Sequence, residues 1–82
     1  MLDEIRGQLQ QITDTAPAGE LQAIRTTLDE LRALLHQMAG TSTNDDVHQA
    51  SRLFGLAHDK TGEAVQALMY ALEHVRSFSA VL

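Results

Sequence analysis

The chain has 82 residues, a net charge of −5 and no cysteine, so disulfides and thiolate metal sites are excluded. A chain this short seldom buries enough apolar surface to be stable alone, which leaves a partner subunit or very regular helical packing as the source of stability. The acidic balance argues against nucleic acid and against anionic membrane surfaces as partners.

Targeting and membrane segments are not evident in the sequence. The N-terminus, MLDEIRGQLQQI, carries acidic residues at once, and the uncharged apolar stretch AVQALMYAL (64–72) is too short to span a bilayer. We therefore expect a cytoplasmic protein without membrane contact, and secretion by a non-classical route stays open.

Apolar residues recur at helical spacing through almost the whole chain, whereas stretches with strand-like alternation are missing. This pattern predicts a single all-α domain over residues 1–82. We expect helical segments at about 2–13, 16–39 and 44–81, with a turn at 40–43.

The first segment carries Leu2, Ile5, Leu9 and Ile12 and is followed by TDTAPAGE (13–20), where the register is interrupted. Pro17 cannot donate a helical hydrogen bond, but it is tolerated in a first turn, and Asp14 or Thr15 is expected to cap a helix that starts just before it. A kink here gives an antiparallel hairpin with a broken first arm. A full turn gives three separate helices, and the sequence leaves that alternative open.

The second and third segments repeat apolar residues at intervals of three and four, which is typical of helices that pack nearly parallel or antiparallel. The predicted seam of the second segment is Leu21, Ile24, Leu28, Leu31, Leu35 and Met38. The predicted seam of the third is Val47, Ala50, Phe54, Ala57, Thr61, Ala64, Leu68, Ala71, Val75, Phe78 and Leu82.

Two glycines, Gly55 and Gly62, lie seven residues apart in the third segment. Each costs about 1 kcal/mol relative to Ala inside a helix, so we expect a close approach by the other arm, with Leu28 or Ile24 filling the groove. The alternative interpretation is a hinge, or a slot for a partner helix.

The connector HQMAGTSTNDDVHQ (36–49) has the features of two helix ends. Gly40 is expected to take the left-handed conformation after the helix, and Thr43 is expected to cap the next helix with Asp46 in the capping-box position. His36 and His48 could approach each other across the connector, which leaves a metal or pH-sensing role open. No Glu-x-x-His pair or HExxH motif occurs, and we predict no metal, cofactor or catalytic site.

A two-helix hairpin buries only one face of each arm, yet the third segment has a second apolar edge and Leu34 widens the second segment. An open edge of this kind marks an association site, so we predict a homodimer that forms a four-helix bundle; a monomeric three-helix bundle is the alternative. The predicted interface and core residues are Leu28, Leu31, Leu34, Leu35, Met38, Leu53, Phe54, Leu56, Val65, Leu68, Met69 and Leu72.

The segments LDEIR, LRALLHQMAGTS and SRLFGLAHDKTGEAVQALMYALEHVRSFSAVL together resemble a family of small actinobacterial helical-hairpin proteins. Members also form the N-terminal region of polymorphic toxins, some with a deaminase domain, and are comparable to the WXG-type hairpins of type VII secretion. The resemblance implies a delivery or docking module, or a partner of a toxin or effector. The chain departs from the WXG pattern because no Trp precedes Gly40 and because His74 follows Tyr70 where an export signal has an acid.

The sequence thus favours a non-enzymatic helical-hairpin interaction module that self-associates and docks a larger protein. The alternative is a stand-alone structural or regulatory bundle subunit that binds and controls a partner. A ligand-binding bundle comes third, and an enclosed cavity among Ala57, Thr61 and Ala64 would favour it.

Overall fold

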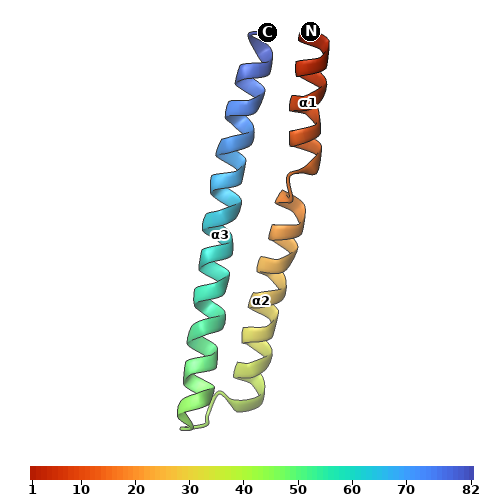
Figure 1. Ribbon diagram of the computed structural model, residues 1–82. Coiled ribbons are helices and arrows are strands. Elements are labelled where there is room, and N and C mark those ends of the chain that lie inside the picture. The colour runs from red at the N-terminus through yellow and green to blue at the C-terminus, as the bar shows by residue number, and fades with distance from the viewer.

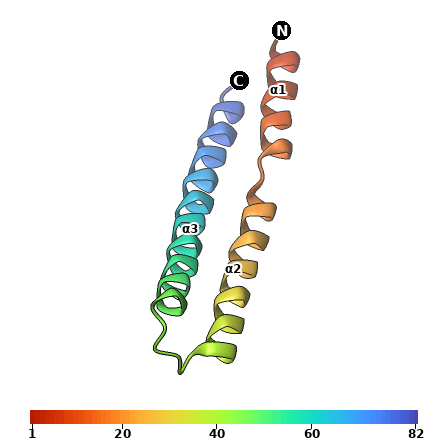
Figure 2. The ribbon, with the colours of Figure 1, turned by 60° about the horizontal axis from the view of Figure 1, so that its bottom comes forward.

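The computed structural model describes residues 1–82 as three helices, α1 (Leu2–Thr15), α2 (Ala18–Ala39) and α3 (Asp45–Ala80). α1 and α2 follow each other along one arm, and α3 runs antiparallel to both as the other arm (Figures 1 and 2). The Cα positions span 63 × 14 × 13 Å. The predicted all-α antiparallel hairpin with a broken first arm is confirmed.

The break in the first arm lies at Ala16 and Pro17. Pro17 is the N-cap of α2, and its carbonyl oxygen accepts a hydrogen bond from the Leu21 N–H at 3.0 Å. No side chain caps this helix, so the predicted cap at Asp14 or Thr15 is wrong; Asp14 instead accepts a hydrogen bond from the Gln10 side chain at 2.9 Å. Because α1 continues along α3, the break is a kink and the chain does not fold back into a three-helix bundle.

The two arms meet along a seam with alternating steps of four and three residues. Of the predicted α2 seam, Leu21, Leu28 and Leu35 are half-buried as predicted. The prediction is wrong for Ile24, Leu31 and Met38, which are exposed. Only Val65 and Leu72 of α3 are buried, with 5% and 6% of their surface exposed. The seam of α3 consists of Val47, Ser51, Phe54, His58, Thr61, Val65, Leu68, Leu72, Val75, Ser79 and Leu82.

Three positions of the predicted α3 seam are wrong, while Ala50 and Ala57 are half-buried. Ala64, Ala71 and Phe78 are exposed, and the residue that follows each of them packs between the arms. Residues three and four positions after a seam residue lie on opposite sides of it, and in the middle of α3 both sides are apolar, with Ala64 and Ala71 on one and Val65 and Leu72 on the other. Val65 and Leu72 fill the space between the arms, whereas Ala64 and Ala71 are too small to reach as far across it.

Gly40 ends α2 without the predicted left-handed conformation. Its φ is −63°, and no residue in the chain has a positive φ. The Gly40 N–H donates to the His36 carbonyl oxygen at 2.8 Å, and a Cβ at this position would collide with that same oxygen. The position therefore suits glycine because the chain approaches itself closely there, and not because of its backbone angle.

The cap of α3 is Asn44 and not the predicted Thr43. The Asn44 side-chain oxygen accepts a hydrogen bond from the Asp46 N–H at 2.8 Å. Asp46 is thus the second helical residue, where its N–H is capped, so it cannot serve as the acid of a capping box. Ser42 supports the turn, because its hydroxyl oxygen accepts a hydrogen bond from the Asn44 N–H at 3.1 Å.

We predict that Asn44→Ala lowers the free energy of unfolding by about 1 kcal/mol, because the Asp46 N–H loses its acceptor. Thr43→Ala is the matched control and should change it by less than about 0.3 kcal/mol. Urea denaturation followed by circular dichroism measures both. A larger loss for Thr43→Ala would show that the cap lies one residue earlier.

Candidate interaction face

One flank of the hairpin carries apolar side chains from both arms. On α2, Ile24, Leu31 and Met38 each lie three residues after a leucine of the seam, and they are 50%, 42% and 74% exposed. On α3, small residues such as Ala64 and Ala71 occupy the same offset from the seam. In antiparallel helices the same offset falls on the same side of the pair, so the two rows share one flank.

We call this surface the apolar face, and it comprises Ile24, Leu31, Leu34, Met38, Ala50, Leu53, Ala57, Ala64, Ala71 and Phe78. Leu34 and Leu53 form its outer edges, and both are about half exposed. The face runs along most of α2 and α3, and Lys60 interrupts its outer edge seven residues after Leu53. Exposed apolar side chains gathered on one flank are typical of a region where another polypeptide binds.

The predicted interface and core residues divide into two groups in the structure. The seam contains Leu28, Leu35, Phe54, Val65, Leu68 and Leu72. The exposed group contains Leu31, Leu34, Met38, Leu53, Leu56 and Met69. Four members of the exposed group belong to the apolar face, while Leu56 extends it toward the back of α3 and Met69 lies on the opposite flank.

The opposite flank is formed by two arginines over two glycines. A Cβ placed on Gly62 would lie 3.0 Å from Nε of Arg25, and one placed on Gly55 would lie 3.4 Å from the guanidinium of Arg32. The predicted close approach at both glycines is present, but the prediction that Leu28 or Ile24 fills the groove is wrong. The matching seven-residue spacings of Arg25 and Arg32 and of the two glycines are the sequence signal for this packing.

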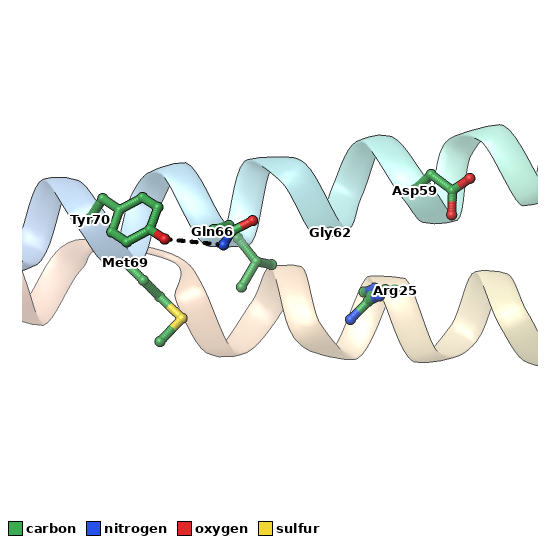
Figure 3. A pocket seen from close by; sticks show the side chains of 7 residues that line it. Arg25, Asp59, Gly62, Gln66, Met69 and Tyr70 are labelled. Carbon is green, nitrogen blue, oxygen red and sulfur yellow. Dashed lines mark hydrogen bonds between the residues drawn. The ribbon is translucent and has the colours of Figure 1, made fainter.

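An open pocket of about 510 Å³ surrounds Arg25 on this flank (Figure 3). Asp59, Gln66 and Tyr70 line it from α3, and the Gln66 side chain donates to the Tyr70 hydroxyl at 3.2 Å. Nε of Arg25 is buried without a hydrogen-bond partner, and Arg25 forms no ion pair. Asp59 instead pairs with His58, whose Nδ1 lies 3.4 Å from its carboxylate.

The histidines and acids do not assemble into a chemical site. His36 lines a second open pocket with Asp29, Arg32 and Ser51, and His48 is not part of it. No group of three His, Asp or Glu side chains is arranged to hold a metal ion. None of the pockets is lined by Ala57, Thr61 and Ala64 together.

We compared the chain with known protein families, curated proteins and solved structures. No family model, no curated protein and no solved structure matches the chain. None of the three helices is sufficiently long and apolar to span a membrane.

We predict that Gly7→Ala raises the free energy of unfolding by about 1 kcal/mol, because Gly7 lies inside α1 with no atom near its missing Cβ. Gly62→Ala should gain clearly less, because the new methyl group displaces Arg25. In an Arg25→Ala background, Gly62→Ala should recover the gain. Chemical denaturation of the four variants measures this, and equal effects of Gly62→Ala in both backgrounds would contradict the arginine–glycine packing.

Proposed function

We propose that this chain is a non-enzymatic helical-hairpin interaction module that works by placing its apolar face against another helical polypeptide. The observation that carries the proposal is the extended apolar face beside a seam in which only Val65 and Leu72 are buried. A helix pair leaves such a flank in water only at a cost of roughly 25 cal/mol per Å² of apolar surface, and a partner removes that cost.

The resemblance to small actinobacterial hairpin proteins suggests which partners such a module serves. In that family the hairpin accompanies a toxin or effector, so the chain is proposed to assist delivery of a larger protein or to pair with it. A regulatory subunit that holds a partner inactive would use the same apolar face. Self-association into a homodimer is compatible with either proposal, because a second copy carries the same kind of surface.

The decisive experiment places a photo-crosslinking amino acid, benzoylphenylalanine, at Leu34 or at Ala33 in the native cell. Leu34 is half exposed on the apolar face, and Ala33 is exposed one residue earlier on the same helix, where it lines the pocket beside His36. One residue of helix turns the side chain by about 100°, so the two positions sample different flanks of one turn. We expect specific adducts from Leu34 and few from Ala33.

Mass spectrometry of the adducts identifies the polypeptide on the apolar face. Adducts from Leu34 with this chain, with another protein or with both support an interaction module. Equal adducts from both positions, or no adducts from Leu34 while helicity is preserved, would contradict the proposal.

A further inference from the structure

We propose that the apolar face is covered by a second copy of this chain, with the tips of the two hairpins at the same end of a four-helix bundle. This inference rests on the proposed function, and it specifies both the partner and the arrangement. Three properties of the hairpin carry it: its surface area, the sizes of the side chains on the apolar face and the charges at the edges of that face.

The accessible surface area of the chain is larger than that of a compact monomer of the same mass. The chain exposes 6188 Å², whereas a compact monomer of 9.0 kDa exposes about 4,900 Å². Its radius of gyration of 18.9 Å compares with about 12 Å for a globular chain of this length. Two copies together therefore carry an excess of about 2,600 Å², which lies within the range of about 2,000 to 5,000 Å² that obligate homodimers bury.

The apolar face is complementary to itself in side-chain size. Arg32 lies against Gly55 and Arg25 against Gly62, which fixes the register of α2 on α3. In that register three pairs of residues lie at the same height along the hairpin, to within about one residue. The pairs are Met38 with Ala50, Leu31 with Ala57 and Ile24 with Ala64. The row of large side chains on α2 thus has the same spacing as the row of alanines on α3.

This match is satisfied when two copies are related by a two-fold axis parallel to the hairpin. It places α2 of each copy on α3 of the other at the same height, so that large side chains of one row seat on alanines of the other, as in well-packed cores. Each helix then has only antiparallel neighbours, which is the arrangement of an up-down four-helix bundle. The outer edges also fit, because Leu34 of one copy meets Leu53 of the other.

The arrangement with tips at opposite ends is less favourable. It packs α3 on α3 and α2 on α2, so that alanines face alanines and the larger Ile24, Leu31 and Met38 rows face each other. When the axis crosses the rod at the level of Lys60, it also brings Lys60 of one copy to Lys60 of the other and sets Leu34 opposite Glu20. Like charges and an apolar group facing a carboxylate both disfavour this alternative.

Spin labels test the arrangement directly, since the chain contains no cysteine to interfere. Thr43→Cys places a label on the exposed connector at the tip, and Ala23→Cys places one on the exposed back of α2 near the middle of the rod. Double electron–electron resonance on each purified variant gives the distance between labels on two copies. We expect a tip-to-tip distance below about 35 Å, set by helices packed 8 to 10 Å apart and the label arms.

Three results would decide the matter. A short distance at both positions supports the proposed bundle. A Thr43 distance approaching the 63 Å length of the rod, with a short distance at Ala23, would overturn the arrangement of the tips. No dipolar coupling at either position, together with a monomer mass by light scattering, would overturn the second copy as the occupant. The proposed function would then still stand if Leu34 crosslinks to a different protein.

Discussion

Two helices in contact can bury only a narrow strip of each, and this constraint accounts for most of what is unusual about the hairpin. The strip on α3 holds Val65 and Leu72 as its only buried side chains. Neither arm has a third helix behind it, because Pro17 bends the first arm without reversing it. The apolar face is the largest set of exposed apolar side chains outside this strip, and covering it is the source of further stability that we propose.

The two flanks of the seam differ in kind, and that difference separates their roles. On one flank the guanidinium groups of Arg25 and Arg32 lie over Gly62 and Gly55, and Nε of Arg25 is buried there. On the other flank Ile24, Leu31 and Met38 remain exposed beside the alanines of α3. The hairpin is thus closed on one side by its own arginines and open on the other.

The sequence predicted the helices, the hairpin and the core positions such as Leu28, Leu35 and Phe54, because each of these depends on a period that continues over many residues. It could not choose between Ala64 and Val65 as the next seam position, because both residues are apolar. The choice is made in space, where the larger side chain reaches the other arm. Much of the surface assigned to the α3 seam therefore became the exposed apolar face.

The predicted caps at the ends of the helices were wrong for a similar reason. Thr43 and Asn44 are both good caps, and only the hydrogen bond from the Asp46 N–H selects Asn44. Gly40 signals a helix end, yet its backbone stays right-handed, because glycine there relieves a collision with a carbonyl oxygen. Residue type predicted where these helices end but not the geometry of each end.

The central claim is that the hairpin is stable because a second copy covers its apolar face, and the concentration dependence of unfolding tests it most directly. When folding is coupled to dimerisation, mass action raises the midpoint of thermal unfolding with protein concentration. For a dimer of this size we expect a rise of about 4 °C for each tenfold increase in concentration, measured by circular dichroism. A midpoint that stays constant over a hundredfold range of concentration would contradict the account.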